Sequence, residues 1–502
     1  MTPAATASAF AVAADLAGPT TPFDRYFLRG VGSCHAYLTL REDFREHVRL
    51  ARREIGFGGI RFHNIFSDQV GIVQGGREAD GGPVLNFQNA TRIYEFFVAQ
   101  GMKPFVELGF MPGRLASGAQ TIFAYRANVT PPCDWAQWSR LVRRFVAHLV
   151  GHFGIHEVAT WHFEVWNEPD LAGAFWTGTR EDYFRLYAET ARAVKSVDAR
   201  LRVGGPATSK TLWISEFLDY CAGQRLPLDF VSTHHYAVDA DLVLDRPDTP
   251  LRYRGPAALA ADAARVRAAI AASAYPRAEL HFTEWNVSPA HDDVFGKDSA
   301  FTAALALQAI KDVSGLADSY MWWTVSDVFE EGGPAARPFS GKYGLVNLHG
   351  VRKPAFHAFR WLAGMHDAEL PLGHPSARAT CSPSGDLRLL AWNLPEVGET
   401  DLGGGDWLLR GAPRTDTFVL RGLRPGRWRL RIRILDTERG SALAAWRRLG
   451  APDYPTSSQL AALHAASEPL LWRDETLDVG DTFTFTLELP PCGLACADFE
   501  RV

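Results

Sequence analysis

The chain alternates between short β-like runs and longer helical patterns from about residue 28 to about residue 360. Stretches such as 43–56, 135–154, 180–198 and 300–315 repeat apolar residues at the spacing of one helix face. Between the helical stretches lie apolar and β-branched runs, which we predict as strands at 28–34, 57–65, 103–110, 161–168, 201–207, 228–236, 279–286 and 318–326. Eight strand–helix repeats over roughly 330 residues predict a (β/α)8 barrel, of class α/β, rather than an open doubly wound sheet.

The pattern changes after about residue 360. Alternating strand-like runs separated by Gly, Pro and Asp turns predict an antiparallel β-sandwich over residues 361–502. Residues 441–474 are helical in places and are expected to cover the sandwich or dock it on the barrel. The N-terminal segment, residues 1–22, is predicted to add a strand to the sandwich, which leaves residues 23–360 for the barrel.

Composition excludes several classes of partner. The 502 residues are 47% apolar and 22% charged, and the net charge of −5 gives no reason to expect nucleic acid or a membrane surface. No apolar run is long enough to span a bilayer, and no G-x-G-x-x-G fingerprint for a dinucleotide follows the first strand. Aromatic residues make up 12% of the chain, which suits either a large core or an aromatic-lined sugar cleft.

Targeting and cysteine usage favour a cytoplasmic protein. The alanine-rich N-terminus lacks a basic region, and Asp15 interrupts it, so we do not expect a standard secretory signal. The six cysteines are scattered without metal-ligand spacing, which indicates free thiols in a reducing compartment. We expect no metal and no cofactor.

Polar residues gather at the predicted ends of the strands, where the chemistry of such barrels lies. Glu168 and Glu284 end the fourth and seventh strands, which face each other across a barrel mouth. Two carboxyl groups on either side of a substrate are what glycosidic cleavage needs: one protonated to donate to the leaving oxygen, one ionised to attack. Pro169 is expected to bias Glu168 to an extended backbone, and Asn167 is placed to donate to a sugar hydroxyl.

Several motifs in order, GVGSCHAYLTLR, GFGGIRFHNIFSD, FEVWNEPD, FVSTHHY and HFTEWN, resemble glycoside hydrolase family 39 of the barrel glycosidase clan A. The resemblance covers nearly the whole chain. It implies Glu168 as acid/base and Glu284 as nucleophile. It also implies sugar contacts from His63, Asn167 and either His234 or His235, and strand alternation favours His234 because it shares a face with Tyr236.

The remaining site residues are predicted from their positions. Arg61 and Tyr236 are placed to keep Glu284 ionised and oriented. Phe110, Trp285, Trp323 and Phe329 are candidates for walls of the sugar site, although a core role suits them equally well. We predict a retaining mechanism through a covalent glycosyl-enzyme, with the two carboxyl groups roughly 5–5.5 Å apart.

The substrate is predicted less directly. Family 39 contains bacterial β-xylosidases and animal α-L-iduronidases, and an iduronidase needs a cation for the uronate. Lys297, Arg337 and Lys342 are available, but each suits a surface role better. Glu330 and Glu331 are placed to bind the substrate by accepting hydrogen bonds from sugar hydroxyls, and they would repel a uronate. This favours an exo-acting β-xylosidase that releases xylose from the non-reducing ends of short β-1,4-xylo-oligosaccharides. The alternatives are an iduronidase-like or other clan A glycosidase and a non-catalytic carbohydrate-binding barrel. The last is less favoured, because both glutamates are present.

Overall fold

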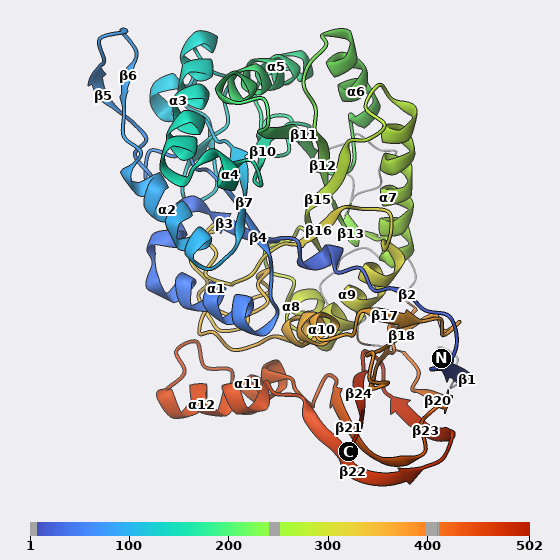
Figure 1. Cartoon of the computed structure of the whole chain (residues 1–502). Coiled ribbons are helices and arrows are strands. Elements are labelled where there is room, and N and C mark those ends of the chain that lie inside the picture. The colour runs from blue at the N-terminus through green and yellow to red at the C-terminus, as the bar shows by residue number, and fades with distance from the viewer. Residues whose placement is uncertain (1–7, 240–251, 397–408, 410) are drawn as a thin grey trace.

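Eight parallel strands close into a barrel in the computed structural model, which describes residues 8–239, 252–396, 409 and 411–502 (Figure 1). Each barrel strand falls on one of the predicted runs. In order around the barrel they are β3 (Val31–His35), β4 (Gly59–His63), β7 (Lys103–Leu108), β10 (His162–Val165), β11 (Arg202–Thr208), β12 (Phe230–Tyr236), β15 (Glu279–Asn286) and β16 (Ser319–Trp322). The predicted (β/α)8 barrel is therefore confirmed.

Helices follow the strands and cover the outside of the barrel (Figure 1). The main ones are α1 (Glu42–Glu54), α2 (Gln88–Ala99), α3 (Trp135–Phe153), α5 (Arg180–Val197), α6 (Ile214–Gly223), α7 (Gly255–Ala272), α9 (Ala300–Asp312) and α10 (Pro354–Ala363). Three of them begin at side-chain caps: Asp134 accepts from the first backbone amides of α3, Thr179 forms a capping box with Asp182 at the start of α5, and Ser299 accepts from Phe301 N–H at the start of α9.

The loops between these elements carry short pieces of structure. They comprise the helices α4 (Ile155–Val158) and α8 (Val294–Lys297) and the strand pairs β5 (Val73–Arg77) with β6 (Pro83–Leu85), β8 (Thr121–Ile122) with β9 (Ala127–Asn128), and β13 (Val238–Asp239) with β14 (Arg252–Tyr253). No helix among the described residues has the length and apolar character needed to cross a bilayer.

A two-sheet sandwich follows the barrel. One sheet has the order β1 (Ser8–Asp15), β20 (Arg414–Arg421), β23 (Thr482–Leu489). The other has the order β2 (Thr21–Pro22), β17 (Ala368–Leu370), β18 (Ala377–Cys381), β19 (Leu387–Trp392), β24 (Leu494–Arg501), β21 (Gly426–Leu435), β22 (Leu470–Val479). The N-terminal strand β1 pairs with β20 in parallel, whereas the other pairs are antiparallel.

The sandwich and the barrel share a continuous core. Trp392 is buried and donates its indole N–H to Gln308 on α9 at 2.9 Å. Two further helices, α11 (Ala442–Arg448) and α12 (Ser457–Ala466), dock on the barrel, because Trp446 and Leu463 pack with Phe339 and Val351 of the barrel loops. The helical segment therefore joins the two parts, one of the two roles expected for it.

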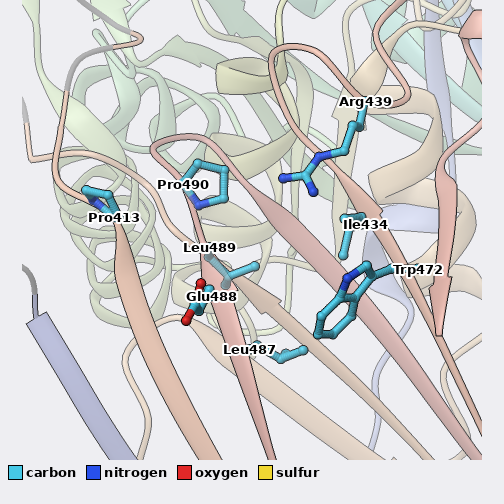
Figure 2. A pocket seen from close by; sticks show the side chains of 8 residues that line it. All are labelled: Pro413, Ile434, Arg439, Trp472, Leu487, Glu488, Leu489 and Pro490. Atoms are coloured by element: carbon cyan, nitrogen blue, oxygen red, sulfur yellow. The ribbon is translucent and has the colours of Figure 1, made fainter.

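A pocket of about 280 Å³ opens in the sandwich (Figure 2). Trp472, on β22, is about half exposed there. The lining residues are Pro413, Ile434, Arg439, Trp472, Leu487, Glu488, Leu489 and Pro490. None of them belongs to the predicted catalytic site, which lies in the barrel.

Candidate active site

The two predicted catalytic carboxyl groups meet inside the barrel mouth. Glu168 follows the end of β10, and Glu284 lies on β15. Three atoms lie within 4.8 Å of one another: one carboxylate oxygen of each glutamate and one ring nitrogen of His234. All three residues are buried. Inverting glycosidases hold their carboxyl groups about 6.5–9.5 Å apart to admit a water molecule. The observed separation therefore suits direct attack on the sugar.

The backbone at Glu168 corrects one expectation. Pro169 was expected to keep Glu168 extended, but the φ of Glu168 is +44°, in the left-handed region. The backbone N–H of Glu168 donates to the carbonyl of Ala207, near the end of the neighbouring strand β11, at 2.8 Å. Trp166 also has a positive φ, of 70°. Such conformations cost free energy in residues other than glycine, so tertiary contacts, not the proline, set the direction of this carboxyl group.

Glu284 is held at both oxygens by hydrogen-bond donors. Arg61 donates from Nη1 to Oε1 at 2.7 Å, and the Tyr236 hydroxyl donates to Oε2 at 2.9 Å. His63 Nε2 lies 3.4 Å from Oε1. A guanidinium and a phenol both stabilise the charged form of a carboxyl group, which suits a nucleophile.

Glu168 has a different environment. Its Oε1 lies 2.9 Å from Nδ1 of His234, a neutral imidazole because burial lowers the pKa of His234 well below its usual value. Burial raises the pKa of Glu168 well above its usual range, and the charge of Glu284 adds to this shift. Burial also raises the pKa of Glu284, but there Arg61 opposes it. Glu168 is therefore the group that keeps its proton, as a general acid must.

A β-bulge sets which side chains of β15 enter the site. The pairing of β12 with β15 runs from Thr233 opposite Phe282 to His234 opposite Glu284, so Thr283 is the extra residue. Thr283 contacts His234 and Glu284 contacts Arg61, both within the barrel. A bulge lets two consecutive side chains face the same way, which regular alternation forbids.

Several other predicted residues lie at the site. Asn167 accepts from Arg61 Nη2 at 2.8 Å through its carbonyl oxygen. His63 packs against Trp323, with ring centroids 4.6 Å apart, and against Phe110 at 5.9 Å. Glu331 lies beside the same histidine, with Oε1 3.8 Å from Nε2.

Two predicted residues, and the histidine that was the alternative to His234, are turned elsewhere. Trp285 is fully buried outside the strand ring and stacks on Tyr320 with centroids 4.1 Å apart, because the bulge directs Glu284 inward and its successor outward. Glu330 is engaged by Arg41 at 2.6 Å and His35 at 3.2 Å. His235 also points outward, with Nε2 2.8 Å from the Tyr320 hydroxyl, as alternation from His234 predicts.

Three residues that the sequence reasoning missed belong to this network. Glu164 accepts from Arg61 Nε at 2.6 Å and from the Thr283 hydroxyl at 2.8 Å. Tyr343, from a loop, is buried close enough to Glu331, Glu284 and Glu168 for their charges to add to the rise in its pKa. Alternation along 162–168 could have indicated Glu164 as inward-facing. No pattern in the sequence signals the bulge that brings in Thr283.

Among the described residues, two groups of side chains have metal-ligand types within 4.8 Å of one another. One is the catalytic group of Glu168, His234 and Glu284, and the other is His162, Glu279 and His281 at the beginnings of their strands. Each already has a guanidinium on one of its carboxylates: Arg61 on Glu284 and Arg202 on Glu279. Arginine thus supplies the positive charge that a metal ion would bring.

A buried carboxyl pair of unequal environment, at the carboxyl ends of the strands of a (β/α)8 barrel, defines the class of retaining glycoside hydrolases. Within this class the chain belongs to glycosyl hydrolases family 39, whose family model matches residues 11–477. The predicted family and enzyme class are therefore confirmed.

Similar proteins agree with this assignment. A β-xylosidase from Geobacillus stearothermophilus is 36% identical over 456 residues, which are 87% of this chain and 85% of that protein. A β-xylosidase from Caldicellulosiruptor saccharolyticus is 42% identical over 340 residues, 68% of each chain. The crystal structure of a monomeric β-xylosidase from Caulobacter crescentus superposes with a TM-score of 0.89 at 34% identity, over 98% of this chain and 100% of that one.

Proposed function

We propose that the protein is an exo-acting β-xylosidase that releases xylose from the non-reducing ends of short β-1,4-xylo-oligosaccharides. The observation that carries the chemistry is the close, unequal carboxyl pair. Glu284, held ionised by Arg61 and Tyr236, attacks the anomeric carbon while Glu168 donates its proton to the leaving oxygen. The second step reverses the role of Glu168, which takes a proton from the water that releases xylose.

The proton affinity of Glu168 changes during this cycle. Before the covalent step the negative charge of Glu284 helps to hold the proton on Glu168. Formation of the ester removes that charge, so the pKa of Glu168 falls and the group becomes a carboxylate that can act as a base. One residue thus serves as acid and then as base because its neighbour changes charge.

The surroundings of the pair support a neutral sugar. Glu331 places a carboxylate beside His63, where a uronate would be repelled. Arg337, one cation considered for a uronate, instead pairs with Asp453 at 3.3 Å. His63, Asn167, Phe110 and Trp323 are the proposed contacts for the hydroxyl groups and apolar face of xylose. The likeness to two β-xylosidases supports the same substrate.

The test compares aryl β-xyloside, α-iduronide, β-glucoside and α-arabinofuranoside with the wild-type enzyme and with Glu284→Gly, with and without azide. We expect preferential xyloside turnover by the wild type. Azide should rescue the variant and give xylosyl azide of inverted configuration, since azide replaces the missing nucleophile. Preferential cleavage of the iduronide would overturn the proposed substrate. Absence of turnover on every glycoside by folded protein would overturn the catalytic assignment.

A further inference from the structure

A chain of hydrogen bonds joins the acid/base to a carboxylate deep in the barrel. Glu164 Oε2 accepts from Arg61 at 2.6 Å, and its Oε1 accepts from the Thr283 hydroxyl at 2.8 Å. The same hydroxyl oxygen lies 3.1 Å from His234 Nε2, and His234 Nδ1 lies 2.9 Å from Glu168 Oε1. All the side chains joined by these hydrogen bonds are buried.

The positions of the hydrogens follow from the number of donors. A threonine hydroxyl has one hydrogen, and here it goes to Glu164, which can only accept because Arg61 pairs with it as a carboxylate. Toward His234 the hydroxyl oxygen is then an acceptor, so Nε2 carries the hydrogen. A neutral imidazole has a single N–H, which leaves Nδ1 as an acceptor. The hydrogen between Nδ1 and Oε1 therefore belongs to Glu168.

We propose that Thr283 is a positioning residue that fixes His234 as the tautomer with hydrogen on Nε2, so that Nδ1 accepts a hydrogen bond from the protonated carboxyl group of Glu168. The inference rests on the proposed function, because it assigns the state of the acid before catalysis. It gives Glu168 a source of proton affinity separate from burial and from the charge of Glu284.

This arrangement has consequences for both steps. A half-turn of the protonated carboxyl group carries its O–H from His234 to the glycosidic oxygen. The proton moves to that oxygen as the bond to the anomeric carbon breaks, and Glu284 forms the new bond. The Glu168 carboxylate left behind faces the lone pair of Nδ1, which repels it and strengthens it as the base that takes a proton from water in the second step.

Other charges also act on the acid and on its histidine. The charged groups that act on Glu168 are Glu284 on β15, Asp170 after Pro169, Asp239 on β13 and Arg61 on β4. The phenols of Tyr236 and Tyr343 also lie near it. The titratable groups that face His234 are Arg61, His63, His235 and, at 3.7 Å, Glu284. A substitution of Thr283 by valine leaves all of these charges in place. It also removes the hydrogen bond to Glu164, so the tautomer of His234 is read directly from its resonances as well as from the pH profile.

The experiment compares Thr283→Val with Thr283→Ser through the pH dependence of kcat/KM on xylobiose, whose leaving group needs an acid. Valine cannot accept from Nε2, so the hydrogen moves to Nδ1, donates to Glu168 and stabilises its carboxylate. We expect the basic limb of the profile to move to lower pH by about one unit or more in the valine variant and to stay in place in the serine variant. Thr233→Val, a buried neighbour that bonds Thr208, is the matched control and should leave the limb unchanged.

A second measurement needs no turnover. The ¹⁵N resonances of His234 in the resting wild-type enzyme should show a protonated Nε2 and an unprotonated Nδ1, and Thr283→Val should reverse them. The inference is overturned if the wild type already has its hydrogen on Nδ1, or if Thr283→Val lowers kcat without moving the basic limb. Failure of the wild type to cleave any xyloside would instead count against the proposed function, since the resonances are read independently.

Discussion

At the residue scale, two glutamates of the same chemistry have different environments because their neighbours differ. Arg61 and Tyr236 occupy both oxygens of Glu284, whereas His234 meets Glu168 as a neutral ring. Identity and strand position predicted the two glutamates, and alternation predicted that His234 rather than His235 faces inward. The expectation of an extended backbone at Glu168 was wrong, because tertiary contacts, among them the hydrogen bond to Ala207, override the local preference before proline.

The phenol of Tyr236 provides a residue-scale prediction. Its hydroxyl donates to the charged form of Glu284 and so lowers the pKa of that carboxyl group. Tyr236→Phe removes this bond, the pKa of Glu284 rises, and the acid limb of the kcat/KM profile should move to higher pH. A hydrogen bond to a charged group contributes about 1.5–3 kcal/mol, which corresponds to about one to two pH units.

The measurement is the pH profile of kcat/KM with an aryl β-xyloside. Tyr320→Phe is the matched control, because the Tyr320 hydroxyl contacts His235 outside the strand ring. An acid limb that stays in place in Tyr236→Phe would show that Arg61 and His63 lower the pKa of Glu284 without help from Tyr236.

At the element scale, the site depends on one irregularity in one strand. The bulge at Thr283 directs both Thr283 and Glu284 inward and turns Trp285 to the outer layer. The periodicity of apolar residues predicted the strand at 279–286 but not the bulge. A bulge is a shift in the pairing with the neighbouring strand, and the residues of the run do not record it. The predicted role of Trp285 depended on that missing information.

The N-terminal strand gives a prediction at the same scale. In β1, Ala14 is buried against the sandwich core, and Ala13 beside it is exposed. Ala14→Asp places an unpaired charge among apolar side chains, which should lower the free energy of unfolding by about 3 kcal/mol or more. Ala13→Asp makes the same substitution on the solvent face and should change it by less than about 0.5 kcal/mol.

Chemical denaturation measures both variants, and xyloside turnover below the transition should equal that of the wild type. Equal stability of the two variants would mean that β1 contributes little to the sandwich.

At the scale of the whole molecule, the sandwich and the barrel are joined through a shared core. Trp392 lies on the sandwich strand β19 and bonds α9 of the barrel, whereas Trp428 packs within the sandwich, stacked on Phe499. Trp392→Ala should lower the free energy of unfolding by about 3–5 kcal/mol and weaken the coupling between the two parts. Thermal unfolding should then separate into two transitions.

Calorimetry together with activity recorded through the transition tests this. Trp428→Ala is the comparison, because it removes a similar volume from the sandwich alone. A single cooperative transition in Trp392→Ala would show that the remaining contacts, those of α11, α12 and the rest of the shared core, are sufficient to couple the two parts.

The sequence by itself determined the eight strands, the barrel, the β-rich tail and the two glutamates proposed for catalysis. These depend on local periodicity and on residue types at strand ends, both of which are written along the chain. The tertiary structure alone decided the left-handed backbone at Glu168, the bulge at Thr283 and the hydrogen-bonded series of side chains from Glu164 to Glu168. Each of these arises where strands distant in sequence meet, and the energy of such a meeting depends on distances and angles that no single run of residues contains.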